Sequence, residues 1–395
     1  MKILHILYQS TPNTAGSSIR SRDIFSSQLS EGLAPIVITS PFQEPLVSGE
    51  QKELIEGVTY YRTFSGIYNE VVSEQRTGFF MQIKKLGRLL KFSVSVYKIA
   101  KEEDVDILHA HAMFFCAFPA KIASFLLNKP MLYEVRSLWE ERYKGVNRYL
   151  DIIFGSITFI ETFAMFLSNE VIAINKTLRL ELKSRFLLKN QKIHIIENAV
   201  NLVRISIKKA ERKVKVFAYI GTISPIEGLD LLIKAFIILH EEGLENKLFL
   251  YGNGVMLPEL KKLAKDCDFI EFKGRFSQDQ ISDVYSEVDI IVNPRKKTFL
   301  TDSVTPLKPL EAMGYKKLIM ASNIGGMREI IENGKTGILF NSDSIQSIKS
   351  EIYSVLNMKD YSCIVENASS YIESHRSWRA NAIKYRNIYK NLINE

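Results

Sequence analysis

Short runs of β-branched and other apolar residues alternate with amphipathic helical segments along most of this 395-residue chain. This alternation constrains the fold more than any other feature, because strands separated by helices pair in parallel through right-handed crossovers. The pattern predicts thirteen strands, whereas most open twisted sheets hold about ten or fewer, so two doubly wound α/β domains are expected. The expected strands are 3–7, 36–39, 58–62, 107–110, 131–135, 171–174 and 193–196, then 216–220, 248–251, 270–272, 290–292, 318–321 and 338–340.

A polar stretch, 201–215, holds six basic residues and separates the two strand-rich halves. We therefore expect a first domain over 1–200 and a second over 201–374, followed by a terminal segment, 375–395, that forms an amphipathic helix. Apolar residues make up 46% of the chain and charged residues 24%, which excludes a disordered, collagen-like or coiled-coil protein.

Three widely spaced cysteines exclude a disulfide framework and a cysteine-based zinc site, and they suit a reducing cytoplasm. The start, MKILHIL, is expected to be a first strand rather than a signal peptide. The most apolar stretch, Tyr149–Ser168, contains Asp151 and Glu161. It is therefore expected to form a helix buried in a domain core, not a membrane span.

Residues 75–101 contain seven Lys and Arg, no Asp or Glu, and several Phe and Leu. Two interpretations fit equally well. One is a basic amphipathic surface that docks on an anionic membrane leaflet, and the other is a domain helix with a solvated basic face. The net charge of +8 is otherwise spread evenly, and no nucleic-acid-binding module is recognised, so nucleic acid is not an expected partner.

Ligands of open α/β sheets bind at the carboxyl ends of the strands, so the loops there are the candidate site. Gly16 and Ser17 open a helix after the first strand, where free backbone N–H groups suit an anion or a sugar. His109 and His111 share one face of a strand, and His111 is nearer its carboxyl end, where it could bond a substrate hydroxyl. No third ligand lies at metal-binding spacing from them, so no metal site is expected.

Arg136 follows the next strand, with Trp139 close behind it. An Arg beside an aromatic residue and acids suits an acceptor surface, although a surface salt-bridge cluster explains it slightly better. An ordinary capped loop is an equal alternative for Gly16 and Ser17, and a packed structural histidine is an equal alternative for His111.

Glycines recur at strand ends in the second half, at Gly221 with Thr222, at Gly252 and Gly254, and just before Arg275. Such turns expose backbone N–H groups that suit a pyrophosphate, so the series predicts a diphosphate pocket. The chain lacks both the GxGxxG dinucleotide fingerprint and the Gly-Lys-Ser/Thr ending of a P-loop.

The segment 293–314 is the richest in candidate residues. Because Pro309 is tolerated only in the first turn of a helix, a helix is expected to begin near Lys308. Glu311 then lies in that turn, where its carboxylate could take a ribose diol while Lys308 neutralises phosphate. The basic triplet that begins with Arg295 is either part of this site or a solvated basic run.

Together these segments resemble the retaining family 4 glycosyltransferases, whose GT-B fold has two facing Rossmann-like domains and a deep cleft between them. The resemblance covers nearly the whole chain in the family's order. It implies an acceptor-side first domain, a nucleotide-sugar-binding second domain and a terminal helix that crosses back to the first. The matching segments are DILHAH, VIAIN, KIHIIENAVN, GTISPIEGLDLLIKAF, LFLYGNG, IEFKGRF, TPLKPLEAMG, ASNIGGMREII and NGKTGILF.

Carried over by residue, the resemblance implies that Gly16 and Ser17 line the donor pyrophosphate and that His111 contacts the transferred sugar. Glu311 would bind the nucleotide ribose, with Lys308 near the diphosphate. The expected catalytic residues are His111, Arg295, Lys308 and Glu311, and the expected donor site also includes Gly221, Thr222, Gly252, Gly254, Arg275, Pro309 and Leu310. Arg136 and Trp139 would lie on the acceptor side.

The chain departs from the family pattern at the phosphate clamp, because Thr222 and Glu227 stand where the family usually has Arg and Lys. We hypothesise that Arg295, with Lys296 or Lys308, replaces this clamp.

The first Glu of the family's E-x7-E motif would fall at Ser303, and Asp302 is one residue away. The segments TPLKPLEAM and SIRSRDI resemble a subgroup found in bacterial exopolysaccharide loci.

The implied reaction moves a sugar, with retention at the anomeric carbon, from a UDP- or GDP-linked donor to a glycan or lipid-linked saccharide in bacterial surface polysaccharide synthesis. A front-side mechanism is expected, without cofactor or metal, in the cytoplasm and peripheral on the inner face of the membrane. The alternatives are a nucleotide-sugar epimerase of the same fold and a nucleotide-sugar-binding protein that has lost turnover.

Overall fold

The computed structural model describes residues 1–12, 16–43, 50–64, 79–138, 140–141, 148–201 and 215–394, without the side chains of 79–86, 148–150 and 278. The chain divides into two compact units. Unit 1 comprises Met1–Glu197 and Trp378–Glu395, and unit 2 comprises Asn198–Ser377. The first division lies close to the expected boundary at residue 200, and the terminal helix belongs to unit 1. Most of the polar stretch 201–215 lies outside the described residues.

Unit 1 contains an eight-stranded sheet in the order β3-β4-β2-β1-β5-β6-β7-β8. Each pair of neighbouring strands is parallel except β3 with β4. The strands are β1 (Lys2–Leu7), β2 (Ala34–Thr39), β3 (Lys52–Ile55), β4 (Val58–Arg62), β5 (Ile107–His111), β6 (Met131–Val135), β7 (Glu170–Ala173) and β8 (Ile193–Ile195).

The antiparallel edge strand β3 was not among the expected strands, so the expectation of purely parallel sheets is wrong at this edge. Glu56 and Gly57 join β3 to β4, and both have positive φ, 48° and 80°. This is the backbone of a two-residue hairpin turn, for which a glycine at the second position is the usual sequence signal.

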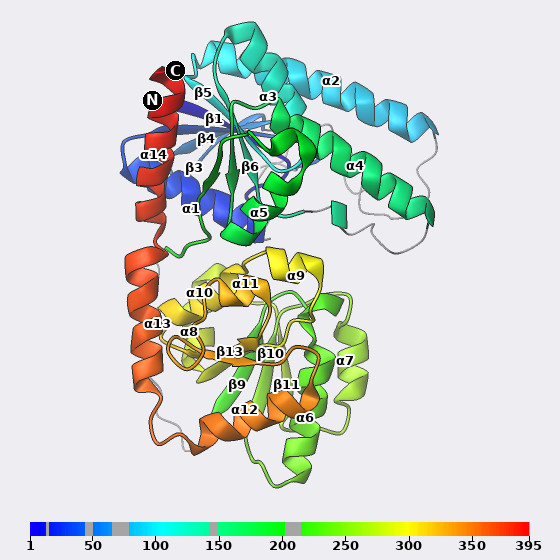
Figure 1. Cartoon of the computed structure of the whole chain (residues 1–395), viewed down its shortest axis with the longest axis vertical. Coiled ribbons are helices and arrows are strands. Elements are labelled where there is room, and N and C mark those ends of the chain that lie inside the picture. The colour runs from blue at the N-terminus through cyan, green and yellow to red at the C-terminus, as the bar shows by residue number, and fades with distance from the viewer. Residues whose placement is uncertain are drawn as a thin grey trace. The chain divides into compact units, whose positions relative to one another are not determined.

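The helices of unit 1 lie on both faces of its sheet (Figure 1). Because crossovers are right-handed, α1 covers one face and α2, α3 and α4 cover the other. α14 packs against α1, and α3 contacts both α2 and α4. The helices are α1 (Gly16–Ser30), α2 (Phe79–Glu102), α3 (Phe114–Leu127), α4 (Arg148–Phe166), α5 (Lys176–Ser184), the short 3-10 turn η2 (Phe186–Leu188) and α14 (Trp378–Asn394).

The apolar stretch Tyr149–Ser168 forms α4, and only one side of this helix is buried. Glu161 and Met165 face the interior, whereas Ile152 is 66% exposed and Phe159 is 63% exposed. The expectation of a helix buried in a domain core is therefore wrong for its outer face. Among the described residues, none of the helices is long and apolar enough to span a membrane.

Unit 2 contains a parallel six-stranded sheet in the order β11-β10-β9-β12-β13-β14. Helices cover both of its faces (Figure 1), and alternate strand residues enter two separate core clusters. The strands are β9 (Val216–Ile220), β10 (Lys247–Tyr251), β11 (Ile270–Gly274), β12 (Ile290–Asn293), β13 (Leu318–Ser322) and β14 (Ile338–Phe340). Its helices and 3-10 turns are η4 (Pro225–Glu227), α6 (Leu229–Glu241), α7 (Leu257–Leu263), η5 (Gln278–Gln280), α8 (Ile281–Ser286), α9 (Phe299–Ser303), α10 (Leu307–Gly314), α11 (Gly325–Arg328), α12 (Ile345–Asn357) and α13 (Ser362–His375).

All of the expected strands are present, with small shifts at their ends, and the two doubly wound domains are confirmed. The strand order reverses between β1 and β5 in unit 1 and between β9 and β12 in unit 2. Ligands of such sheets bind at the carboxyl ends of the strands beside these switch points, which is where the candidate residues were sought.

Candidate functional site

Strand pairing at the switch point of unit 1 brings three histidines together. His5 on β1 pairs with His109 on β5, and His111 follows on the same face of β5. The His109 and His111 rings stack at 4.1 Å, which confirms that they share a face. Register also places His111 beside Glu134 on β6.

Glu134 is the centre of this group and is fully buried. Its Oε1 accepts from Arg20 Nε at 3.1 Å and from Arg136 Nε at 2.9 Å, and its Oε2 accepts from the Tyr385 hydroxyl at 2.5 Å. Burial alone would raise the pKa of the Glu134 carboxyl, but Arg20 and Arg136 outweigh it and hold that pKa well below its usual value. The carboxylate is therefore charged and fully bonded.

Arg136 connects two residues that the sequence analysis assigned to different roles. Its NH2 donates to His111 Nδ1 at 2.7 Å, and its NH1 donates to the Ser17 carbonyl at 3.0 Å in the first turn of α1. The side chain is only 11% exposed. The salt-bridge cluster therefore exists, but it lies inside unit 1 and not on its surface.

The hydrogen bonds of His111 have a fixed direction. A guanidinium can only donate, so His111 Nδ1 accepts from Arg136 and Nε2 carries the ring proton. This N–H donates to His5 Nδ1 at 2.8 Å, which leaves the His5 proton on Nε2, 2.9 Å from Gln28 Oε1. The Arg136 side chain thus sets the tautomers of two histidines.

The same chain of bonds continues to the terminal helix. Gln28 Nε2 donates to the Tyr389 hydroxyl at 3.1 Å, and this hydroxyl lies 2.8 Å from His109 Nδ1, to which it donates. His109 is then protonated at Nε2, which faces Glu134 Oε2 at 3.6 Å. The series of hydrogen bonds that begins at Arg136 therefore ends at His109, beside Glu134. The Glu134 carboxylate is also the group that Arg136 Nε bonds.

All three histidines are neutral near neutral pH. Burial, and next the Arg136 guanidinium, lower the pKa of His111 to about 3. Burial also lowers the pKa values of His5 and His109 well below their usual value. Because His111 is 1% exposed and both of its ring nitrogens are bonded, a sugar hydroxyl could reach it only by displacing Arg136 or His5.

Nitrogen atoms of the three histidines lie within 4.8 Å of one another, so by composition the group could hold a metal ion. The inference that His109 and His111 lack a third ligand is therefore wrong. His5 is distant in sequence, but the pairing of β1 with β5 places it beside them. The chemistry fits a cation poorly, since His5 and His111 bond each other and Arg20 and Arg136 lie beside them. That the protein needs no metal remains a prediction.

At the switch point of unit 2, the loop after β12 packs against the turn before α6. Gly228 has a φ of 66°, and a Cβ there would lie 2.0 Å from the Pro294 carbonyl oxygen, so glycine is required. Lys296 N donates to the Ile226 carbonyl at 2.9 Å. This packing places Arg295 beside residue 227, and Arg295 NH2 donates to Glu227 Oε1 at 3.0 Å.

Arg295 retains donors that the protein does not use. Its side chain is 12% exposed, and within the described residues its Nε and NH1 are buried without a hydrogen-bond partner. Lys296 on the same loop pairs with Asp230 at 3.1 Å. Arg295 is therefore the candidate residue that most needs an anionic partner.

The expected glycines pack the strand-end loops against one another. Gly252 has a φ of 133°, and a Cβ there would lie 1.8 Å from the Gly221 carbonyl oxygen. The amides of Gly221 and Gly252 donate to Tyr251 and Gly274, and Gly254 donates to the Asn253 side chain. The expectation that these glycine amides are free for a pyrophosphate is therefore wrong in this arrangement.

Lys308 and Glu311 lie in the first turns of α10, as expected, and bond each other at 2.8 Å. The Tyr285 hydroxyl also donates to Glu311 Oε2, at 3.2 Å. Oε1 has no hydrogen-bond partner in the described part of the chain, so it is available to a ribose hydroxyl. Pro309 and Leu310 are buried beneath this turn, and only their backbone could meet a ligand.

The remaining candidate residues form no hydrogen bond or ion pair with the Glu134 group of unit 1 or with Arg295, Lys308 and Glu311 of unit 2, as far as the described residues go. Arg275 is exposed after β11, and Trp139 lies outside the described residues. Asp302, considered above as a neighbour of the missing glutamate, accepts from the Gly325 amide at 2.5 Å, while Ser303 is buried. Within the described residues no hydrogen bond joins Arg295 to Lys308.

The sequence analysis missed six members of the unit 1 group, among them His5 and Gln28. Glu134 could have been found from the pairing of β5 with β6, because alternation places it beside His111. Tyr385 and Tyr389 are four residues apart and so share a helix face, but their partner was not evident. Arg20, in α1, lies in the segment SIRSRDI, but the resemblance of that segment assigned it no role.

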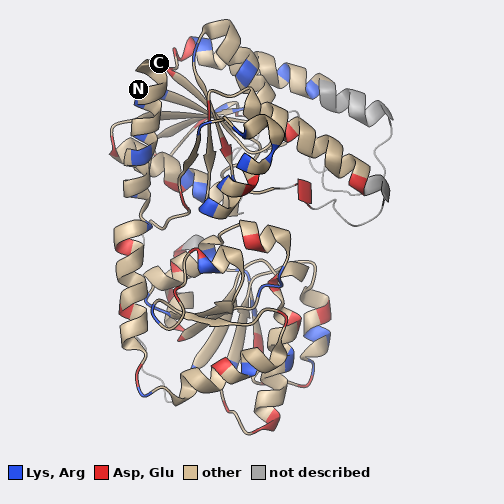
Figure 2. Ribbon diagram, in the orientation of Figure 1, with Lys and Arg blue, Asp and Glu red and all other residues tan. Residues whose placement is uncertain are grey.

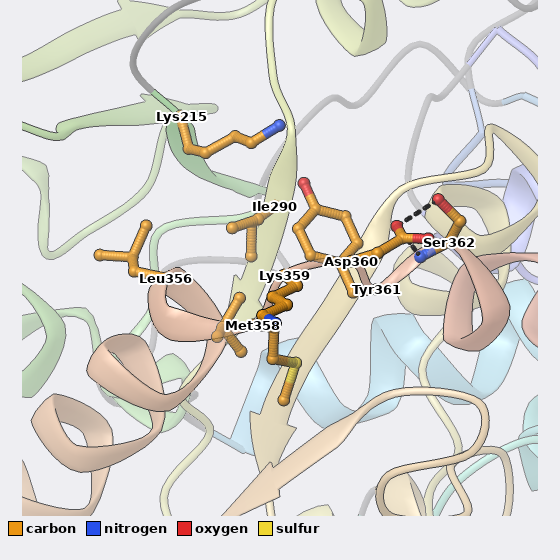
Figure 3. Close-up of a pocket in the computed structure, with 9 residues that line it drawn as sticks. Lys215, Ile290, Leu356, Met358, Lys359, Asp360, Tyr361 and Ser362 are labelled. Carbon is orange, nitrogen blue, oxygen red and sulfur yellow. Dashed lines mark hydrogen bonds between the residues drawn. The ribbon is translucent and has the colours of Figure 1, made fainter.

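A small cavity of about 210 Å³ lies elsewhere in unit 2 (Figure 3). Lys215 and Ile290, which line it, stand at the amino ends of β9 and β12, and Tyr361 and Ser362 cover it. Because ligands of parallel sheets bind at the opposite edge, this cavity is not the candidate site.

Solved structures share this two-unit architecture. Sucrose-phosphate synthase from Thermosynechococcus elongatus matches with a TM-score of 0.76 at 15% identity, over 100% of this chain and 99% of its own. Anabaena HepE in complex with UDP-glucose matches with a TM-score of 0.71 at 16% identity, over 99% of this chain and 100% of its own. The fold is the GT-B fold of glycosyltransferases.

Two family models match adjoining parts of the sequence. The Glycosyltransferase Family 4 model matches residues 33–204, and the model for glycosyl transferases group 1 matches residues 204–384. The chain is therefore a glycosyltransferase of the family 4 type.

Curated proteins of similar sequence are also glycosyltransferases by name. An uncharacterized glycosyltransferase of Methanocaldococcus jannaschii is 24% identical over 99% of this chain and 98% of its own. The capsular polysaccharide biosynthesis glycosyltransferase CapM of Staphylococcus aureus is 24% identical over 60% of this chain and 63% of its own.

Proposed function

We propose that this protein is a retaining glycosyltransferase that uses a UDP- or GDP-linked sugar to extend a glycan or a lipid-linked saccharide in bacterial surface polysaccharide synthesis. The name of CapM supports the pathway, and the UDP-glucose bound to HepE supports the donor class. Membership of the exopolysaccharide subgroup and a location on the cytoplasmic face of the membrane are parts of the same proposal.

The observation that carries the proposal is the position of Arg295 and its unused hydrogen-bond donors. Glu227 stands where the family usually has a lysine, and Arg295 is bonded to that same residue. A guanidinium therefore lies beside the side chain at the family's lysine position, and its Nε and NH1 have no partner among the described residues. These N–H groups suit diphosphate oxygens, because hydrogen bonds between two charged groups are stronger than those between neutral ones.

In the proposed reaction the bond between the anomeric carbon and the diphosphate breaks while the acceptor oxygen attacks from the same face. The departing diphosphate oxygen takes the acceptor proton, and Arg295 stabilises the negative charge that develops. Lys308 contributes positive charge, and Glu311 Oε1 holds the ribose. Since cations of the protein carry this charge, we propose that EDTA leaves the rate unchanged.

Calorimetric titration with UDP- and GDP-sugars tests the donor site. Arg295→Ala is expected to weaken donor affinity at least about tenfold, the loss typical of a charge-assisted bond. Lys335→Ala, an exposed lysine elsewhere in unit 2, serves as the control and should bind normally. Unchanged affinity in Arg295→Ala would contradict the assignment.

Product analysis tests the reaction itself. Release of the nucleotide together with an α-linked product from an α-linked donor supports a retaining transferase. An epimerised nucleotide sugar would support the epimerase, and binding without any turnover would support a protein that has lost activity.

A further inference from the structure

From Ile152 to Phe166 the exposed residues of α4 are apolar except for Ser156. Ile152, Phe159, Phe163 and Phe166 are exposed there by 66%, 63%, 38% and 47%. Their positions, i, i+7, i+11 and i+14, lie on one helix face. The Phe159–Phe163 and Phe163–Phe166 ring pairs stack at 6.3 and 6.4 Å. These four residues are called the α4 face below. Exposed apolar groups of this size mark interaction sites.

The exposed hydroxyl beside the α4 face, that of Ser156, is already satisfied. The Ser156 hydroxyl donates to the Ile152 carbonyl at 3.0 Å. The only acidic residue between Ile152 and Phe166 is Glu161, and it is buried, where it accepts from the Phe114 amide at 2.7 Å. The α4 face therefore offers neither charge nor hydrogen bonds, whereas protein interfaces carry about one hydrogen bond per 100–200 Å². The hydrocarbon of a lipid bilayer is a partner that forms no hydrogen bonds and carries no charge.

Neighbouring elements enlarge the apolar surface. Phe125 on α3 is 82% exposed and Phe186 on η2 is 83% exposed. Both α3 and η2 contact α4. Arg185, just before η2, donates to the Thr162 hydroxyl of α4 at 3.2 Å, which holds Phe186 close to this helix.

Basic residues outnumber exposed acidic residues on the same side of the sheet. Lys91, Lys98 and Lys101 are exposed on α2, and within the described residues none of them forms an ion pair. Residues 87–101, 114–128 and 151–167 contain five Lys and Arg against Asp151 and the buried Glu161. Figure 2 shows blue residues along α2 and a mostly tan α4. An apolar helix face in the same layer as a basic helix suits an anionic lipid surface.

We infer that the α4 face inserts into the boundary between headgroups and acyl chains of an anionic phospholipid membrane, with the lysines of α2 facing the headgroups. The sequence analysis placed membrane contact on 75–101 alone, whereas the apolar part of this surface belongs to α4. The inference concerns binding and holds whether or not the transferase proposal does.

Sedimentation of the full-length protein with lipid vesicles tests this inference. The wild type is expected to bind vesicles of phosphatidylcholine with about one third phosphatidylglycerol, and to bind pure phosphatidylcholine less. Phe159→Ser/Phe163→Ser is expected to lower the partition coefficient at least about tenfold, because two phenylalanines no longer leave water. Val255→Ser, which replaces a 79% exposed residue of unit 2, is the matched control and should partition as the wild type does.

A depth probe gives a second measurement. Phe159→Trp is expected to show a blue-shifted emission on PG vesicles and quenching by lipids brominated near the headgroup. Undiminished binding of the double serine variant, or no spectral change in Phe159→Trp, would overturn the inference. So would a wild type that ignores vesicles but dimerises in light scattering while the double variant is monomeric, since a second copy would then cover the face. Circular dichroism establishes that each variant is folded, and donor affinity is measured separately.

Discussion

The two switch points occupy the same place in their sheets but satisfy their charges differently. In unit 1, Glu134 is fully buried and its two arginine partners and Tyr385 belong to the same unit. In unit 2, Lys308 and Glu311 are 34% and 21% exposed. The charged group of unit 1 is therefore buried with its partners inside the same unit. The ion pair of unit 2 remains accessible to a ligand.

Arg295 sharpens the contrast. The guanidinium of Arg136 donates from Nε, NH1 and NH2 to groups of unit 1, whereas Arg295 uses only NH2 among the described residues. A buried donor without a partner costs free energy, which is why we propose that a diphosphate meets the unused donors of Arg295. The comparison teaches that the charges of Glu134, Arg20 and Arg136 are paired within unit 1, whereas Arg295 keeps donors that a ligand could use.

Glu134→Gln is expected to have the largest effect on stability. It leaves Arg20 and Arg136 buried beside a neutral amide, so the free energy of unfolding of unit 1 should fall by about 3–5 kcal/mol. Both tryptophans of the chain, Trp139 and Trp378, belong to unit 1, so tryptophan fluorescence during urea unfolding reports this unit.

Glu311→Gln is the matched variant in unit 2. Because its ion pair is partly solvated, a loss of about 1 kcal/mol or less is expected, and circular dichroism would measure it. Equal losses in the two variants would refute the contrast between the groups.

Acid should destabilise unit 1 next most strongly. Unfolded His111 takes up a proton near pH 6.5, whereas the folded residue stays neutral until about pH 3. The unfolded state therefore binds more protons over this range, and stability should fall as pH drops below 6.5, by about 1.4 kcal/mol per pH unit for His111 alone. His5 and His109 act in the same direction.

Urea unfolding between pH 7 and pH 5 measures this slope. His240→Asn, which removes an exposed histidine of unit 2, is the control and should keep the wild-type slope. A flat profile over this range would mean that the three histidines are not held neutral.

Tyr389→Phe should have a smaller effect, a loss of about 1–3 kcal/mol, because Gln28 and His109 each lose a buried partner. Tyr285→Phe, which removes the hydroxyl on Glu311, should cost about 1 kcal/mol or less. Nitrogen-15 NMR of the histidine rings adds an independent readout. It should show His111 protonated at Nε2 in the wild type at pH 6, and an Nδ1–H form would contradict the proposed bonding.

Arg295→Ala should affect stability least, with a change within about 1 kcal/mol, because the loss of its one ion pair is offset by the removal of two buried donors that have no partner among the described residues. The same substitution is expected to have a large effect on donor affinity. A large loss of stability without a loss of affinity would assign Arg295 to the scaffold and remove the distinction between the two units.

Most of the fold followed from the sequence because strand and helix periods are local. The strands were predicted from short runs, and so was the start of α10 near Lys308, since Pro309 restricts where a helix can begin. The edge strand β3 was missed because its four residues, Lys52–Ile55, show only a weak alternation. The exposed face of α4 was missed because apolar content alone does not tell which residues a sheet covers.

The site was predicted less completely because its bonds join distant parts of the chain. The sequence supplied His111, Arg136, Arg295, Lys308 and Glu311 as candidates, each at the end of a strand or the start of a helix. It could not supply the amide contacts that occupy Gly221 and Gly252, because these depend on how neighbouring loops pack.

The sequence by itself determined two doubly wound units, the positions of their switch points and the chemical types of residue that stand there. Only the tertiary structure decided which of those residues are already paired. Glu134 and Tyr385 are 251 positions apart and meet because α14 belongs to unit 1. Arg295 meets Glu227 because a loop packs on Gly228. Periodicity is a property of neighbouring residues, whereas the pairing of buried charges depends on how remote segments pack.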